Sequence, residues 1–158
     1  MKILIRLWTI WCFTIAPFLF FIYAILMILL IMIPLNGFTY IFYQITPYFS
    51  TFLLFIMGVK INLTGFNPYV QKDPTIYISN HKSYLDIFII SAMLPGKLKY
   101  LGKAEVFKWP VFGWLAKISG QIPVQRESKE SRAYSYDLMK LSLEQGYSII
   151  LFPEGGWK

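Results

Sequence analysis

The pattern of apolar and polar positions divides this chain into two parts. From Leu7 to Ile33 almost every residue is apolar, and at about 1.5 Å per residue such a helix is long enough to cross a hydrocarbon core of roughly 30 Å. The pattern therefore predicts a membrane helix, with Pro17 as a point where it can kink. A cleavable signal peptide fits less well, because the apolar stretch is too long and ends at Pro34 rather than at a small-residue site.

The second apolar segment, Phe38 to Met57, is less uniform. It contains Gln44, Thr46, Pro47, Ser50 and Thr51 among its aromatic residues. This mixture predicts a helix that lies in or re-enters the membrane interface rather than a second full crossing. Lys2 and Arg6 favour a cytoplasmic N-terminus. The rest of the chain is then at the cytoplasmic face of the membrane if the number of crossings is even or zero, and outside if it is one.

Beyond Gly58 the pattern changes to short β-rich runs that alternate with amphipathic segments, which is typical of an α/β domain. We therefore expect a pair of membrane-anchoring helices in residues 1–58 and an α/β domain in residues 59–158. The expected strands are Val59–Thr64, Thr75–Ser79, Leu98–Gly102, Gln121–Gln125 and Ser148–Phe152. The expected helices are Ser83–Met93, Trp109–Ser119 and Ser128–Gln145, the last with an apolar stripe of Tyr134, Leu138, Leu141 and Leu143.

The charges are as unevenly placed as the apolar residues. The formal net charge is +7, all eight acidic residues lie from Asp73 onward, and only Lys2 and Arg6 are charged before Lys60. A basic domain beside an apolar arm suits an anionic lipid surface and phosphorylated substrates. Nucleic acid is a poorer partner, because the basic residues form no run. The single Cys12 excludes an internal disulfide and a cysteine-based zinc cluster.

The first candidate for chemistry is the stretch from Ser79 to Asp86, which contains the only histidine of the chain, His81. A histidine can take a proton from an alcohol, and a carboxylate that holds its other ring nitrogen fixes the tautomer and stabilises the imidazolium. The spacing of His81 and Asp86 allows such a pair at a helix start. It equally allows a capping box between Ser83 and Asp86, in which the acid only closes the helix.

A second candidate is Phe152-Pro153-Glu154-Gly155-Gly156, which follows a strand that looks buried. Open α/β sheets bind ligands at the carboxyl ends of their strands, and glycines allow a polar ligand to approach the backbone closely. An ordinary Pro-Gly turn explains the same residues.

Taken in order, the motifs resemble the lysophosphatidic acid acyltransferase family. The resemblance covers about residues 59 to 156, and the apolar arm is similar to the N-terminal membrane helix pair of that family. The most specific motifs are His-x4-Asp and Phe-Pro-Glu-Gly. The residues that carry the resemblance are Asn80-His81-x4-Asp86, Lys103-Ala104-Glu105 before Pro110-Val111-Phe112-Gly113-Trp114, Gly120 to Arg126, and Phe152 to Gly155.

The resemblance implies transfer of a fatty acyl group from acyl-CoA or acyl-carrier protein to the sn-2 hydroxyl of 1-acylglycerol 3-phosphate (lysophosphatidic acid), which gives phosphatidic acid. By this resemblance His81 is the general base and Asp86 orients it. Arg126, Glu154 and Gly155 match acceptor-binding positions, with Lys103 as a further candidate for the phosphate. No cofactor or metal is implied, because the thioester is a co-substrate. Arg126 is equally explained as part of a solvated charged stretch.

The chain also departs from the family pattern. Where the third motif usually continues Thr-Arg-Ser, this chain has Gly156-Trp157-Lys158, and the segments that follow in the family are not in the sequence. These departures predict that the chain is truncated relative to the family. Two alternatives stay open, an acyltransferase for another lysophospholipid or an amino-acid lipid, and an inactive membrane-associated remnant.

Overall fold

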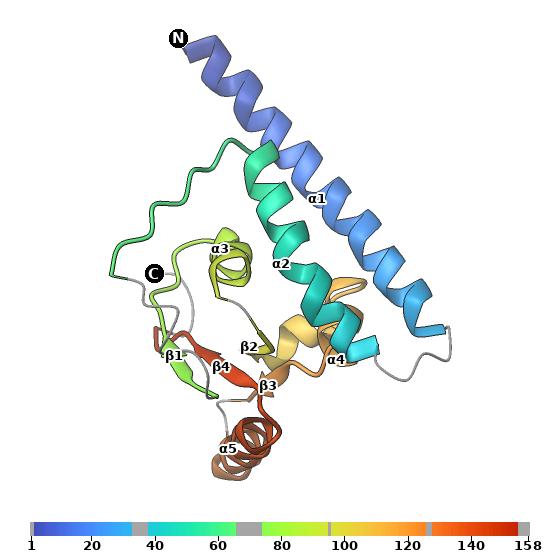
Figure 1. Cartoon of the computed structure of the whole chain (residues 1–158), viewed down its shortest axis with the longest axis vertical. Coiled ribbons are helices and arrows are strands. Elements are labelled where there is room, and N and C mark those ends of the chain that lie inside the picture. Colours follow the sequence, from blue (N-terminus) through green and yellow to red (C-terminus); the bar gives the residue numbers. More distant parts are fainter. Residues whose placement is uncertain (1, 33–37, 66–73, 95, 126–127, 155–158) are drawn as a thin grey trace.

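The computed structural model describes residues 2–32, 38–65, 74–94, 96–125 and 128–154. Both apolar segments of the sequence are helices, α1 (Lys2–Met32) and α2 (Phe38–Ile56). They lie side by side, and α1 extends well beyond α2 at its N-terminal end (Figure 1). The two predicted membrane-anchoring helices are therefore both present as helices.

The rest of the described chain is built around a parallel sheet. Its strands are β1 (Ile76–Ile78), β2 (Leu98–Lys103), β3 (Ile122–Val124) and β4 (Ser148–Leu151). They lie in the order β1-β4-β2-β3, and every neighbouring pair is parallel. The α/β class expected from the sequence is confirmed.

The strand order decides which face of the sheet each helix covers. The connections through α3 (Leu85–Met93) and α4 (Phe112–Ile118) both move toward β3, whereas the connection through α5 (Lys129–Glu144) returns from β3 to β4. Because such crossovers are right-handed, α3 and α4 must share one face and α5 must cover the other. Figure 1 shows this arrangement, with α5 on the opposite side of the sheet from α1 and α2.

Helix ends follow the expected local chemistry. Ser128 caps α5, because its side chain accepts a hydrogen bond from the Ser131 backbone N–H at 3.0 Å. Gly120 and Gly146 follow α4 and α5 with φ of +71° and +83°, the left-handed conformation typical of a helix C-terminus. A short 3₁₀-helix, η2 (Ala104–Lys108), precedes α4 and was not predicted from the pattern.

Two sequence predictions are wrong, one of them in part. Val59–Thr64 is not a strand, and its residues pair with no strand in the part of the chain described. Alternation shows only that an extended segment has two faces, whereas a strand also needs a neighbouring edge to bond. The apolar stripe of α5 is wrong in part, because Tyr134 and Leu141 are exposed, whereas Leu138 and Leu143 are half-buried. The fully buried residues of the helix are Ser135 and Ser142. Their small side chains let the helix lie close to the sheet, and the Ser135 hydroxyl donates to the Pro123 carbonyl at 2.9 Å.

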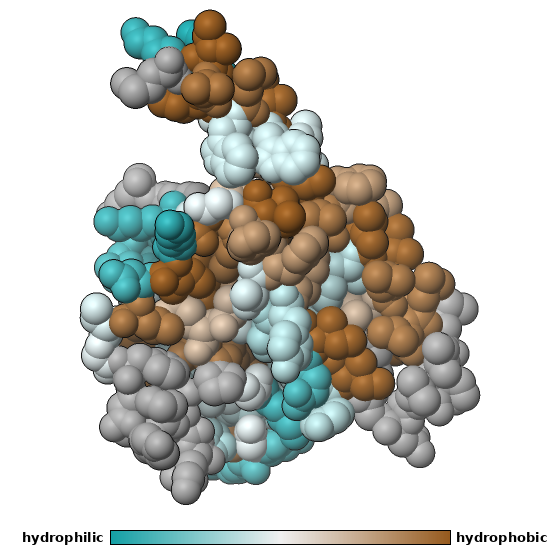
Figure 2. Space-filling model, turned by 45° about the horizontal axis from the view of Figure 1, so that its top comes forward, coloured by the Kyte–Doolittle hydropathy of each residue, from teal (hydrophilic) through white to brown (hydrophobic). Residues whose placement is uncertain are grey.

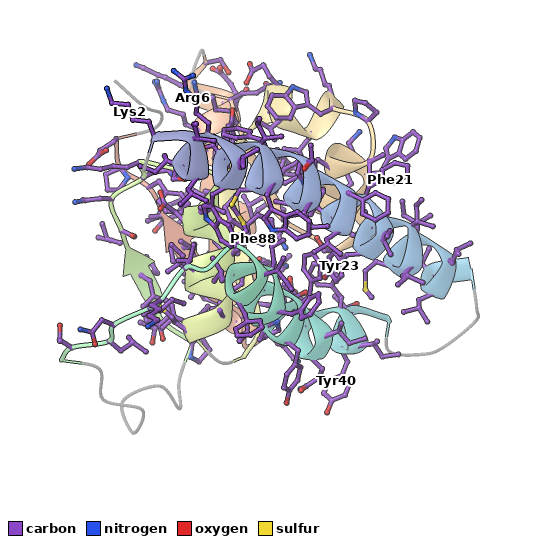
Figure 3. All side chains as sticks on the ribbon, turned by 90° about the horizontal axis from the view of Figure 1, so that it is seen from above. Lys2, Arg6, Phe21, Tyr23, Tyr40 and Phe88 are labelled. Atoms are coloured by element: carbon purple, nitrogen blue, oxygen red, sulfur yellow. The ribbon has the colours of Figure 1, made fainter. Side chains whose placement is uncertain are left out.

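The apolar helix pair packs directly on the α/β part. Tyr23, Ala24 and Met27 of α1 form a buried cluster with Phe42 and Tyr43 of α2 and Leu115 of α4. Aromatic rings continue this contact to α3, since Phe88 meets Phe20 at 6.1 Å and Phe49 at 6.3 Å between ring centroids. Figure 3 shows Phe88 lying under α1 and α2. The division at residue 58 stays a prediction, but α3 packs against α2 on one side and its Ile87 carbonyl accepts from Tyr100 of β2 on the other.

The surface of α1 is strongly apolar. Its outer face exposes a series of large side chains near the N-terminus, and Figure 2 shows this apolar surface with a polar tip at the N-terminal end. By length and composition, Lys2–Ile31 is the one described helix that is apolar enough to cross a membrane. Lys2 and Arg6 lie together at the N-terminal end of α1 (Figure 3), and this end is remote from the sheet in Figure 1. The large exposed residues include Ile3, Leu4, Ile5, Leu7, Trp8, Ile10, Trp11 and Phe13.

Candidate functional site

The candidate site is built at the carboxyl end of β1. The chain leaves the strand at Ile78 and passes through His81 before it enters α3 at Leu85. His81 Nδ1 lies 3.0 Å from Asp86 Oδ2, and the two side chains keep 16% and 20% of their accessible surface. An ionised carboxylate can only accept, so Nδ1 donates and Nε2 is the basic ring nitrogen. This is the tautomer that a general base needs.

The same carboxylate oxygen also closes the start of α3. Asp86 Oδ2 accepts from the backbone N–H of Lys82 at 2.7 Å and of Ser83 at 2.8 Å. Ser83 in turn uses its side-chain oxygen to accept from the Leu85 N–H at 3.1 Å. The pairing with His81 and the capping role of Asp86 are therefore present together. One oxygen serves both, and neither interpretation excludes the other.

These bonds set the charge state of Asp86. Partial burial raises the pKa of the carboxyl group, but the bonds from the Ser83 N–H, the His81 ring and the Lys82 N–H stabilise the anion. The net pKa of Asp86 is lower than that of an ordinary aspartate. The carboxylate thus remains ionised at neutral pH and can stabilise a positive charge on the imidazole.

Phe152 brings the second motif to the first. Strand β4 pairs with β1 in the register Ile78 to Leu151, and the Ser79 N–H donates to the Leu151 carbonyl at 3.0 Å. Phe152 follows directly, and its ring stacks on the His81 ring at 4.2 Å between centroids and 23° between planes. Phe152, the first residue of the segment that the sequence singled out after β4, therefore forms one wall of the histidine site.

The contacts of the His81–Asp86 pair described above do not include the other predicted site residues. Glu154 is exposed two residues beyond Phe152, and Lys103 is exposed at the end of β2. Because β2 and β4 are parallel, Lys103 at the end of β2 lies at the same edge of the sheet as the carboxyl end of β4. Arg126 and Gly155 lie outside the described residues, so their assignment stays a prediction.

Two residues of the site were not found from the sequence. Phe152 was noted only as part of the Phe-Pro-Glu-Gly motif, without a role of its own, and Tyr100 of β2 was not noted at all. Tyr100 lies beneath α3, where its hydroxyl donates to the Ile87 carbonyl at 3.0 Å and contacts the Ser91 hydroxyl at 2.7 Å. Phe152 can contact both His81 and Tyr100 because β4 lies between β1 and β2. No local pattern in the sequence indicates that strand order.

Two hollows of the described surface lie away from the His81–Asp86 pair. These adjoining hollows of about 390 and 530 Å³ run along α5 and β3, and they share Ala104, Pro123, Gln125 and Tyr134. Neither is lined by His81 or Asp86. We place the site by the hydrogen-bonded pair rather than by these depressions, because proton transfer depends on the position of the imidazole.

The family of this chain follows from its match to a known family model. A family model described as Acyltransferase matches residues 60–158. The chain belongs to the Acyltransferase family. The match begins where the α/β part begins and includes both candidate motifs.

Curated acyltransferases resemble the same region. The lyso-ornithine lipid O-acyltransferase of Pseudomonas aeruginosa is 32% identical over 112 residues, which cover 71% of this chain and 41% of that protein. The chloroplastic 1-acyl-sn-glycerol-3-phosphate acyltransferase LPAT1 of Arabidopsis thaliana is 34% identical over 98 residues, or 61% of this chain and 27% of that protein. The chain thus spans less than half the length of these two relatives.

A solved structure has the same fold. The crystal structure of the 1-acyl-sn-glycerophosphate acyltransferase PlsC from Thermotoga maritima matches with a TM-score of 0.77 at 18% sequence identity. The match covers 99% of this chain and 63% of that one. The helix pair and the parallel sheet of this chain therefore form an arrangement that also occurs in an experimental structure.

Proposed function

We propose that this chain carries the base-catalytic part of an enzyme that transfers a fatty acyl group from a thioester to the free hydroxyl of a lysolipid. The single observation that carries the proposal is the 3.0 Å contact between His81 Nδ1 and Asp86 Oδ2 at the carboxyl end of a parallel strand. Family membership and the similarity to lysolipid acyltransferases support the reaction class. The donor is acyl-CoA or acyl-carrier protein.

In the proposed reaction, His81 Nε2 takes the proton of the acceptor hydroxyl while that oxygen attacks the thioester carbonyl carbon. The tetrahedral intermediate collapses when the carbon–sulfur bond breaks, and the imidazolium returns its proton to the departing thiolate. An ester and a free thiol result. Asp86 stabilises the transient imidazolium through Nδ1. No acyl-enzyme is needed, since the acceptor oxygen is itself the nucleophile.

Lysophosphatidic acid is the first acceptor that we propose. The Arabidopsis relative is named for 1-acyl-sn-glycerol 3-phosphate. Two exposed residues support this acceptor, Lys103 at the end of β2 and Glu154 shortly after β4. Arg126 and Gly155 complete the proposed acceptor set. An arginine binds phosphate through two parallel hydrogen bonds, whereas a lysine acts as a point charge. Product release would leave phosphatidic acid in the membrane.

A lyso-ornithine lipid is the second candidate acceptor. The Pseudomonas relative is named for it and is similar over a larger share of this chain than the Arabidopsis relative. In addition, Trp157 stands where the phosphate-acceptor family usually has an arginine. An ornithine headgroup carries no phosphate and does not need that charge.

The test is an acceptor competition. Membranes that contain the chain are given a radiolabelled acyl thioester, as acyl-CoA or as acyl-carrier protein, together with lysophosphatidic acid, lyso-ornithine lipid or both. Label in phosphatidic acid supports the first acceptor, and label in ornithine lipid supports the second. A His81→Ala version of the chain is the matched control. Equal labelling with this variant and the unmodified chain would overturn the proposal.

A further inference from the structure

Five residues around the histidine form a closed circuit of contacts. Asp86 holds the His81 ring, and the His81 ring stacks on Phe152. The Phe152 ring faces the ring of Tyr100 at 6.4 Å between centroids and 21° between planes. The Tyr100 hydroxyl donates to the carbonyl of Ile87, which is the residue directly after Asp86. The circuit joins β2, the end of β4, the loop after β1 and the first turn of α3.

The hydroxyl of Tyr100 is the member of this circuit that fixes α3. Since the hydroxyl has one hydrogen and gives it to the Ile87 carbonyl, the Ser91 hydroxyl must donate to the Tyr100 oxygen at 2.7 Å. Burial raises the pKa of Tyr100, so the hydroxyl stays protonated and remains a donor. The backbone of Tyr100 is itself fixed, because its N–H donates to Gln121 Oε1 at 2.7 Å.

We propose that Tyr100 is a positioning residue that sets the orientation of the His81 imidazole from two sides. Through its ring it supports Phe152, on which the imidazole stacks. Through its hydroxyl it fixes the turn of α3 that carries Asp86, to which the imidazole is bonded. This inference rests on the proposed role of His81 as the base, and Tyr100 itself touches neither the proton nor the substrate.

Because His81 is the only histidine of the chain, its ring can be observed directly. The ¹⁵N shifts of the two imidazole nitrogens report which one carries the proton. They are measured on the intact chain in detergent micelles, well above the pH range in which imidazole ordinarily titrates. In the unmodified chain we expect the Nδ1–H form to dominate, because Asp86 can only accept.

Tyr100→Phe keeps the ring and removes the hydroxyl. We expect the two ¹⁵N shifts to move toward each other, since a less constrained Asp86 turn allows both tautomers. In an active preparation we expect kcat to fall about tenfold, with the KM values of donor and acceptor changed by less than about twofold. Phe152→Leu removes the ring contact instead, and we expect the same direction of change in the ¹⁵N shifts.

Two variants serve as matched controls. Tyr23→Phe removes a buried tyrosine hydroxyl that also makes a 2.7 Å bond, to Thr46, but lies in the α1–α2 contact. Ser91→Ala removes the other partner of the Tyr100 hydroxyl and leaves its bond to Ile87 intact. Neither should change the ¹⁵N shifts of His81.

The two proposals fail in different ways. If Tyr100→Phe lowers the melting temperature as Tyr23→Phe does but leaves the ¹⁵N shifts unchanged, Tyr100 is only a core residue and the inference is overturned. If Tyr100→Phe does not fold, unchanged ¹⁵N shifts in Phe152→Leu overturn it in the same way. Full activity of His81→Ala would instead refute the proposed role of His81 as the base. The tautomer measurement needs no substrate, so it would still test the circuit of contacts.

Discussion

A single oxygen atom, Asp86 Oδ2, joins the His81 ring to the local fold of the chain. It accepts hydrogen bonds from the His81 ring and from the backbone at Lys82 and Ser83. The backbone bonds hold the oxygen in place, and the oxygen in turn holds the imidazole. A helix-capping acid with this geometry can therefore also be the orienting acid of a catalytic pair.

Substitution of Asp86 separates these two roles. Asp86→Asn keeps the size of the side chain and an oxygen that can accept from the backbone, but it lacks the charge that supports an imidazolium. We expect a folded protein that loses on the order of 1 kcal/mol of stability and about 10²-fold or more in turnover. His81→Ala should show a similar loss of turnover. Melting temperature and kcat are measured together, and near-normal turnover in Asp86→Asn would leave the residue with a capping role alone.

The pH dependence of stability follows from the same carboxyl group. Because the pKa of Asp86 is lower in the folded than in the unfolded chain, its contribution is fully present above the unfolded value, about 4. It is lost as the pH falls through the folded value. We therefore expect the melting temperatures of the unmodified chain and Asp86→Asn to differ most at neutral pH and to converge in acid. A difference that is constant from pH 7 to pH 3 would contradict the assigned ionisation.

At the scale of elements, the contact between η2 and α4 depends on one glycine. A Cβ at Gly113 would collide with the backbone carbonyl of Phe107. The neighbouring Val111 has a φ of +63°, so the turn that enters α4 is already sterically costly. The sequence Pro110 to Trp114 thus includes a glycine because two backbones meet there.

This close approach predicts a large effect from a single methyl group. Gly113→Ala should destabilise the fold by about 2 kcal/mol or more, since backbone cannot move aside as a flexible side chain can. Gly102→Ala is the control within the same fold, because its added Cβ would meet only the Phe107 ring, at 3.3 Å. Chemical denaturation measures both. The prediction fails if Gly113→Ala is no less stable than Gly102→Ala.

Elements were easier to predict from the sequence than the contacts between them. The four strands of the sheet and the five α-helices all correspond to expected segments, since periodicity and glycine positions are local signals. His81 and Asp86 were also predictable, because only five positions separate them. Tyr100 was not, because its role depends on β4 lying between β1 and β2. For Val59–Thr64 the error is the opposite one, a predicted strand that does not form. Its residues have a strand-like pattern, but they pair with no strand in the described part of the chain.

At the scale of the whole molecule, the exposed apolar surface of α1 indicates how the protein is held. Large side chains such as Phe13, at 78% exposure, have no partner surface within the described residues, and an apolar area of this kind is typical of contact with lipid. Both helices of the pair also pack against helices of the α/β part. The apolar helix pair and the sheet are thus parts of one structure.

We expect the chain to be recovered with membranes and to stay there in high salt. Salt screens the attraction between basic residues and anionic lipids, but it does not release a buried apolar helix. The measurement is immunodetection after sedimentation, with and without a wash in 1 M salt, where the Debye length is about 3 Å. Release by salt would indicate that the basic domain alone holds the protein. Recovery in the soluble fraction without aggregation would exclude anchoring by α1.

The position of α3 between α2 and the sheet has a consequence for biogenesis. During synthesis the ribosome releases α1 and α2 before α3 and the strands of the sheet. The helix that carries Asp86 then completes its packing against α2, with Phe88 meeting Phe49 of that helix. The packing of the turn that carries the His81–Asp86 pair thus depends on a helix that precedes it in the chain by some thirty residues. A chain that lacked α2 would leave this side of α3 without its cover.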